Sequence, residues 1–144
     1  MKAYADTSFL ARIYLTQTDS PKALVFMRDF REPLPFTPLH RHELRNALRL
    51  AVFRGEIDGE RLRTAFWDIE SDLDDGILAH VPVAWTTAFR QAEQLGAAHT
   101  EKMGVRGVDL LHVGIAQALG MTDFLTFDLR QSELALAAGF EVKF

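Results

Sequence analysis

Two aspartates stand where an extended segment gives way to a predicted helix. Asp6 follows residues 2–5, and Asp128 follows the strongly apolar residues 124–127. In parallel α/β sheets such junctions share one edge, and ligands bind at that edge. Aspartate is also a favoured helix N-cap, and Gln131, three residues after Asp128, resembles the partner in a capping box. Each aspartate alone therefore fits either a binding site or a helix cap.

Two further acids lie on predicted helices. Glu43 neighbours Leu39, Ala47 and Leu50 on a helical wheel, at the margin of an apolar stripe. Asp109 opens the most apolar helical segment of the chain, where the helix dipole also favours an acid. If the fold gathers the four acids, each pair about 5 Å apart repels by about 3 kcal/mol at an effective dielectric of about 20.

A bound divalent cation would turn this repulsion into attraction. The chain has no cysteine, and its histidines show no ligand spacing. Carboxylates and water suit Mg²⁺, with Mn²⁺ as its substitute, better than they suit zinc. Such a site activates a water molecule and stabilises charge on a phosphodiester. The acids therefore indicate metal-dependent phosphodiester hydrolysis, provided that the fold brings them together.

Hydrophobic periodicity and turn residues predict alternating strands and helices. We expect strands over residues 2–5, 34–37, 77–81, 124–127 and 141–144. We expect helices through residues 10–14, over 20–31 after a Ser20 cap, over 38–54, from an Asp58 cap to about residue 73, from a cap at Thr86 or Thr87 to about 104, and over 108–119 and 129–138. Gly139 is the expected C-cap of the last helix. This alternation predicts an α/β fold with a parallel sheet covered on both faces.

Composition places the chain among globular proteins of one domain. Its 144 residues are 48% hydrophobic and 25% charged, which is ordinary for such a domain. No apolar run approaches the roughly 20 residues that span a bilayer. The N-terminus has no basic segment followed by an apolar one, so we expect a cytoplasmic protein without membrane contact.

The charges are unevenly distributed along the chain. The net charge is −4, but residues 1–54 contain nine Lys and Arg against five Asp and Glu. A basic surface can therefore coexist with an acidic whole. Arg41, Arg45 and Arg49 recur every four residues and face about 200° away from Glu43. We expect a solvated face there, with contact to a distal RNA segment or a partner as the alternative.

Four segments in a fixed order carry a resemblance to a known family. They read YADTS at residues 4–8, HEL at 42–44, RGVDLLH at 106–112 and LTFD at 125–128, and GFEV follows at 139–142. Together they resemble the PIN domain family over essentially the whole chain. The likeness is greatest to the small bacterial and archaeal ribonuclease toxins of VapBC-type toxin–antitoxin modules.

This resemblance implies a fold, an activity and partners. The fold would be a three-layer α/β/α sandwich, with residues 1–144 as a single PIN-like nuclease domain. The activity would be Mg²⁺-dependent RNA cleavage, with Asp6, Glu43, Asp109 and Asp128 as the catalytic, metal-binding acids. The partners would be RNA, an antitoxin protein and a second copy of the chain. The alternatives are an RNA-processing nuclease without an antitoxin, and a module that binds RNA or protein without cutting.

The resemblance also gives supporting roles to two hydroxyl residues, Ser8 and Thr126. A strand period of two would place Thr126 on the same face as Asp128, whereas Ser8 also fits a simple helix start. Arg106 and Arg130 lie in the segments that carry Asp109 and Asp128, and are placed to contact phosphate.

The helical positions of His112 and Trp67 lead to two further predictions. His112 falls in the apolar stripe of its helix, so we expect a buried core histidine and not a general base. Trp67 lies off the stripe of its own helix. Exposed aromatic residues are enriched at interfaces, so Trp67 marks a dimer or antitoxin contact unless it packs on a neighbouring helix.

Overall fold

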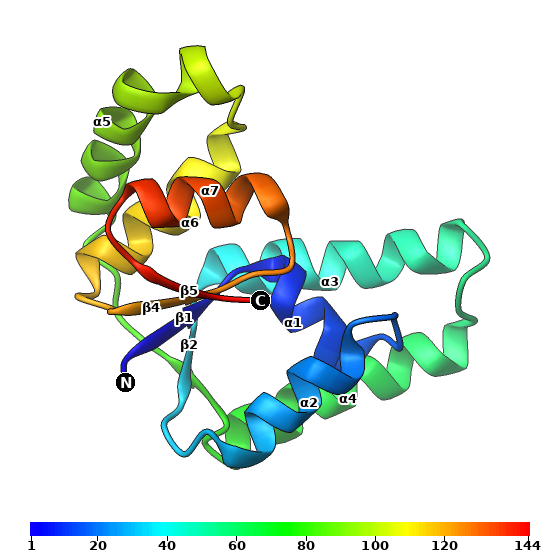
Figure 1. Cartoon of the computed structure of the whole chain (residues 1–144). Helices are drawn as coiled ribbons and strands as arrows, with labels where there is room; N and C mark the ends of the chain where they lie inside the picture. Colours follow the sequence, from blue (N-terminus) through cyan, green and yellow to red (C-terminus); the bar gives the residue numbers. More distant parts are fainter. The chain divides into compact units, whose positions relative to one another are not determined.

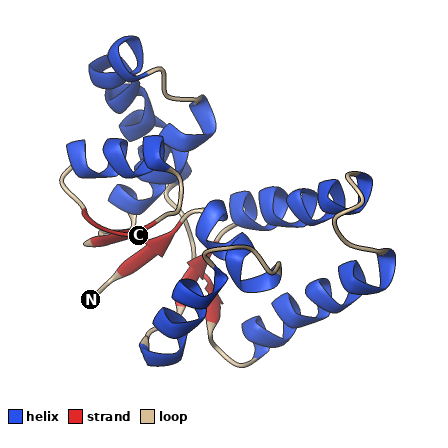
Figure 2. Cartoon of the chain, turned by 45° about the vertical axis from the view of Figure 1, so that its right-hand side comes forward, coloured by secondary structure: helices blue, strands red, loops and turns tan.

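The computed structural model describes all of residues 1–144, which form two compact units. The first unit comprises Met1–Asp6 and Pro82–Phe144, and the second comprises Thr7–Val81. In each unit helices predominate over short strands (Figures 1 and 2). No helix is both long enough and apolar enough to cross a membrane. The single domain expected from the sequence stays a prediction.

The first unit contains a parallel sheet of three strands. Its strands are β1 (Ala3–Ala5), β4 (Asp123–Leu125) and β5 (Glu141–Lys143), in the order β1-β4-β5. Ala5 lies opposite Leu125, so β1 and β4 end at the same level. The next residue of each strand, Asp6 and Thr126, therefore leaves the sheet at the same edge.

Three helices belong to this unit, namely α5 (Trp85–Met103), α6 (Gly107–Ala118) and α7 (Leu129–Ala137). Helices α5 and α6 lie side by side (Figure 1). Gly114 of α6 makes their close approach possible, because a Cβ atom there would lie 2.5 Å from the Ala88 carbonyl oxygen and 3.0 Å from the Ala92 nitrogen. The interhelical packing thus requires a residue without a side chain.

Replacing Gly114 with alanine should destabilise the protein. The added methyl group meets backbone atoms, which cannot rotate away, so we expect the free energy of unfolding to fall by about 1–3 kcal/mol in urea denaturation. Gly107→Ala is the matched control, because no atom lies within 4 Å of a Cβ at that position. Equal stability of the two variants would contradict the proposed packing constraint.

The second unit contains β2 (Leu34–Phe36) and β3 (Leu78–His80), which pair in parallel. Its helices are α1 (Thr7–Tyr14), α2 (Ser20–Asp29), α3 (Pro38–Phe53) and α4 (Gly59–Asp74). Helix α3 begins with a capping box between Thr37 and His40, and Asp58 caps α4 as predicted. The core contains fully buried side chains from both strands and helices: Leu34, Phe36, Leu44, Leu48, Ile69 and Leu78.

The predicted fold class is confirmed, because every strand pairing is parallel and helices alternate with strands. All five predicted strands are present, although they pair as one sheet of three strands and one of two. His112 is buried and its Nδ1 atom lies 2.6 Å from the Tyr4 hydroxyl, as expected for a core histidine. Trp67 is 70% exposed and so does lie off the buried stripe.

Two predicted helix caps are wrong. Ser20 is the first residue of α2, and its hydroxyl donates to the Leu15 carbonyl instead of capping the helix. Helix α5 begins at Trp85, before Thr86 and Thr87, since the Ala88 N–H already bonds to the Ala84 carbonyl.

The predicted end of the fourth strand and the predicted last C-cap also need correction. Strand β4 ends at Leu125, so Thr126 lies beyond the strand in which it was placed. The C-cap of α7 is Ala138, and Gly139 follows it with a φ of 94°.

A partly buried hydroxyl–carboxylate pair joins α1 to α4 in the second unit. The Tyr14 hydroxyl donates to the Asp72 carboxylate over 2.6 Å. Burial raises the pKa of Asp72, an effect that the hydrogen bond from Tyr14 partly opposes. Burial and the nearby carboxylate raise the pKa of Tyr14 as well, so its hydroxyl stays a proton donor.

Tyr14→Phe should destabilise the protein in a pH-dependent way. Loss of the donor leaves the partly buried carboxylate without this bond, at a cost of about 1–3 kcal/mol near neutral pH. Because the pKa of Asp72 is already raised in the folded state and would rise further, acid protonates the carboxyl group and the deficit shrinks as pH falls. Urea denaturation at neutral and acidic pH measures this change. When Asp72 is replaced by asparagine, which keeps an acceptor without charge, the effect of Tyr14→Phe on stability should not depend on pH in this way.

Candidate active site

Asp6 follows β1 directly, and its buried carboxylate accepts a hydrogen bond from Thr126. Asp6 is only 4% exposed. The fully buried Thr126 donates its hydroxyl hydrogen to Asp6 Oδ2 over 2.6 Å. The Asp6 N–H bonds to the Leu125 carbonyl over 3.1 Å, which extends the β1–β4 pairing by one residue. The orientation of Asp6 is therefore fixed by both its backbone and its side chain.

The same threonine hydroxyl connects Asp6 to Asp128. Thr126 Oγ1 accepts from the Asp128 N–H over 3.0 Å while it donates to Asp6. Asp128 Oδ1 in turn accepts from the Gln131 N–H over 3.1 Å and caps α7. The capping role predicted as an alternative is thus real. It uses only one of the two carboxylate oxygens.

Arg106 brings the third aspartate into this arrangement. Its guanidinium Nε lies 3.0 Å from Asp109 Oδ2, and its Nη2 lies 3.9 Å from Asp128 Oδ2. The backbone N–H of Gln131 donates to the Asp128 cap, and its side-chain N–H donates to the Asp109 carbonyl over 3.2 Å. Asp109 and Asp128 therefore lie within reach of one guanidinium group and are also joined through Gln131.

Three of the four predicted acids consequently form one connected network in the first unit. Asp6 and Asp128 share Thr126, while Asp109 and Asp128 share Arg106. The sequence had identified Gln131 only as a possible cap, but it is fully buried and links the two helices. A glutamine one turn after Asp128 was the only sequence signal for this second role.

Glu43 and Ser8 belong to the second unit. Glu43 Oε1 accepts a hydrogen bond from the Thr7 hydroxyl over 2.8 Å. The sequence assigned no role to Thr7, although its position directly after Asp6 was a usable signal. The Ser8 carbonyl accepts from Arg12 Nη1 over 2.9 Å. The predicted roles of Glu43 and Ser8 in the site stay predictions.

Arg130 is exposed on α7 and makes no ion pair.

No group of three or more acidic or histidine side chains is already arranged to hold a metal ion. The network offers carboxylate and hydroxyl oxygens, and Mg²⁺ and Mn²⁺ prefer such ligands. The Arg106 guanidinium is a cation beside two of the same carboxylates.

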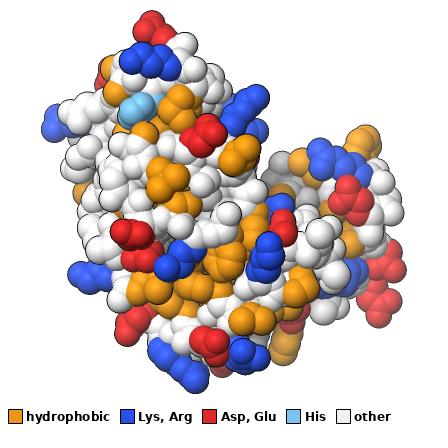
Figure 3. All heavy atoms as spheres, viewed as in Figure 1, with side chains coloured by type: hydrophobic (Ala, Val, Ile, Leu, Met, Phe, Trp, Pro, Cys, Tyr) orange, Lys and Arg blue, Asp and Glu red, His pale blue; other side chains and the backbone are white.

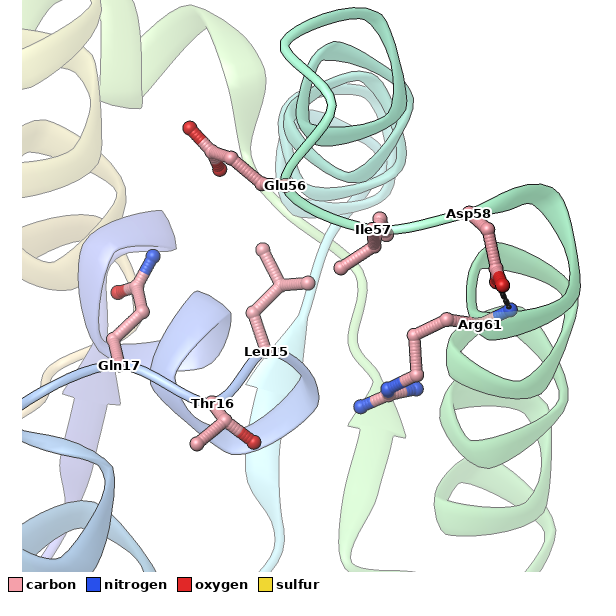
Figure 4. A pocket seen from close by; sticks show the side chains of 7 residues that line it. All are labelled: Leu15, Thr16, Gln17, Glu56, Ile57, Asp58 and Arg61. Carbon is pink, nitrogen blue, oxygen red and sulfur yellow. Dashed lines mark hydrogen bonds between the residues drawn. The ribbon is translucent and has the colours of Figure 1, made fainter.

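A hollow of about 450 Å³ lies in the second unit and contains none of the predicted site residues (Figure 4). It is lined by Leu15, Thr16, Gln17, Glu56, Ile57, Asp58 and Arg61. Asp58 caps α4 through the Arg61 N–H, and the Arg61 side chain donates to the Tyr14 carbonyl over 2.6 Å. These charged residues therefore have structural roles, and the aspartate network remains the candidate site.

Comparison with solved structures identifies the fold. No protein-family profile and no curated protein matches the chain. One similar structure is that of VapC20 of Mycobacterium tuberculosis, which is described as a sarcin–ricin loop cleaving toxin. It aligns over 96% of this chain and 95% of its own, with a TM-score of 0.67 and 18% identity. The chain has a PIN-like fold.

Two further structures share this PIN-like fold. FitAcB of Neisseria gonorrhoeae aligns over 99% of this chain and 96% of its own, with a TM-score of 0.65 and 13% identity. PAE2754 of Pyrobaculum aerophilum aligns over 99% and 89%, with a TM-score of 0.60 and 14% identity. At these identities the likeness establishes the PIN-like fold alone, so the activity has to be argued from the site.

Thr126→Val should destabilise the first unit, which contains the three aspartates. The substitution keeps the shape of the side chain but removes a buried donor to Asp6 and an acceptor for the Asp128 N–H. We expect a loss of about 1–3 kcal/mol in the free energy of unfolding, measured by chemical denaturation. Thr126→Ser retains the hydroxyl and should lose clearly less. A valine variant as stable as the serine variant would show that the hydroxyl does not organise the site.

Proposed function

We propose that the protein is a Mg²⁺-dependent endoribonuclease and acts as the toxin of a toxin–antitoxin pair. The observation that carries this proposal is the connected network of Asp6, Asp109 and Asp128 around Thr126 and Arg106. Acids that serve only as caps would not need a buried hydroxyl shared between two of them. The PIN-like fold, found also in an RNA-cleaving toxin, supports the same activity.

The three aspartates supply oxygen ligands of the kind that a hard divalent cation requires. Bound there, Mg²⁺ would supply charge neutralisation and water activation for hydrolysis of a phosphodiester. Mn²⁺ is expected to substitute. We assign Glu43 to the same set of acids, with Thr7 as the residue that orients its carboxylate.

Each remaining residue of the site has a definite task in this proposal. Thr126 fixes the carboxylate of Asp6, and Ser8 adds a second hydroxyl. Arg106, whose side chain is 67% exposed, is placed to contact the phosphate of the substrate, and Arg130 to contact a neighbouring one. In-line attack by water at phosphorus breaks the bond to the 3′ oxygen and leaves 3′-hydroxyl and 5′-phosphate ends.

Asp6→Asn and Asp109→Asn should each abolish RNA cleavage with little loss of folded protein. Each variant removes a negative charge that holds the cation, and several kcal/mol of charge stabilisation correspond to a fall of about 1000-fold or more in kcat/KM. Cleavage of a labelled single-stranded RNA with Mg²⁺, with Mn²⁺ and with EDTA measures this effect.

Asp74→Asn is the matched control, because Asp74 is an exposed acid at the end of α4. It makes the same chemical change without touching the network, so its cleavage rate should equal that of the wild type. Wild-type cleavage by either site variant, or full activity in EDTA, would refute the metal-dependent nuclease.

The biological role needs a separate experiment. Expression of the chain alone should arrest growth of the host, and co-expression of a small neighbouring reading frame should relieve the arrest. We expect the neutralising protein to bind in the cytoplasm and the toxin to act as a homodimer. Cleavage in vitro without growth arrest would indicate an RNA-processing nuclease instead. Absence of both cleavage and Mn²⁺ binding in calorimetry would indicate a binding module.

A further inference from the structure

Helix α3 carries a groove of about 330 Å³ whose lining contains no carboxylate. The groove is lined by Pro38, Arg41, His42, Arg45, Asn46 and Arg49. Elsewhere, on the face visible in Figure 3, basic and acidic side chains are interspersed. Three arginines on one groove are therefore a local exception in a protein whose net charge is −4.

An aromatic ring from α4 holds two of these arginines in place. The guanidinium carbon of Arg45 lies 3.8 Å from the centre of the Phe66 ring, and that of Arg49 lies 4.9 Å from it. Cation–π contacts of this kind restrain the guanidinium group while its N–H donors stay available. The groove thus presents cations that are already positioned, which lowers the entropy that a ligand must overcome.

A single acid opposes the three positive charges. Glu70 Oε1 lies 2.6 Å from Arg41 Nη2 and 3.8 Å from Arg45 Nη1, and Arg49 makes no ion pair. Burial and then the neighbouring guanidinium groups of Arg41 and Arg49 lower the pKa of Arg45, against the opposite effect of Glu70. The arginines therefore repel one another, and a polyanion would relieve that repulsion.

We propose that this groove binds the phosphate backbone of an RNA strand, on the side of α3 that does not carry Glu43. The inference rests on the proposed function, which makes RNA the polyanion that the protein meets. Arg41 and Arg45 lie about 200° around α3 from Glu43, and Glu43 is hydrogen-bonded to Thr7 on its own side. The groove therefore contributes to affinity and not to the chemical step. His42 and Asn46 add hydrogen-bonding groups beside the arginines.

The salt dependence of RNA binding tests the groove directly. Fluorescence anisotropy of a labelled single-stranded RNA, measured in EDTA so that no cleavage occurs, gives log Kd against log salt. Each phosphate contact contributes about 0.7 to that slope for a single strand. Arg49→Gln should reduce the slope by about 0.7, and the triple change of Arg41, Arg45 and Arg49 to glutamine should reduce it by about 2. Arg49→Lys should retain the wild-type slope.

Two further variants separate RNA binding from general effects of charge and folding. Arg90→Gln changes the net charge equally but lies on α5, and it should leave the slope unchanged. Glu70→Gln removes the one acid that competes for Arg41 and Arg45, so it should tighten RNA binding several-fold. A purely structural role for the ion pair predicts no such gain.

The proposal is overturned if the triple variant keeps the wild-type slope, or if the wild-type protein does not bind RNA in this assay. Neither result depends on cleavage, so the proposed nuclease activity is judged independently by the Asp6 and Asp109 variants. Circular dichroism of each arginine variant verifies that it is folded before its affinity is compared.

Discussion

The candidate site depends on one hydroxyl group, that of Thr126. It donates to Asp6 and accepts from the backbone of Asp128, and it can do both only because β1 and β4 end at the same level. A shift of one residue between these strands would turn the threonine to the other face of the sheet. The parallel register of two three-residue strands therefore determines whether two acids separated by 122 positions in the chain can act together.

Helix packing sets the position of the third acid. Asp109 lies in the first turn of α6, and α6 is placed against α5 by the close approach at Gly114. Gln131 then joins the start of α6 to the start of α7 through the Asp109 carbonyl. The three aspartates thus come from a strand end, a helix start and a helix cap. Each is placed by ordinary packing and hydrogen bonding.

Acidic and basic side chains predominate in different parts of the chain. In the first unit acids predominate at the candidate site, and one exposed arginine, Arg106, lies beside Asp109 and Asp128. In the second unit the arginines of α3 predominate, and one acid, Glu70, opposes them. A cation suits the first arrangement and a polyanion suits the second. A chain with a net charge of −4 can therefore still present a local surface suited to a polyanion, as the proposed RNA binding requires.

The sequence by itself determined the fold class and all five strands, and it singled out three aspartates that the structure connects, because strand-to-helix junctions and apolar stripes are local patterns. It also indicated that Arg41 and Arg45 face away from Glu43, since helical periodicity fixes directions within one helix. Only the tertiary structure decided that Ser20 bonds to Leu15 instead of capping α2, and that Gly114 allows two backbones to meet. The link from Thr126 to both aspartates and the stacking of arginines on Phe66 likewise join residues that are distant along the chain. No local pattern encodes such contacts, because they arise only when separate elements pack together.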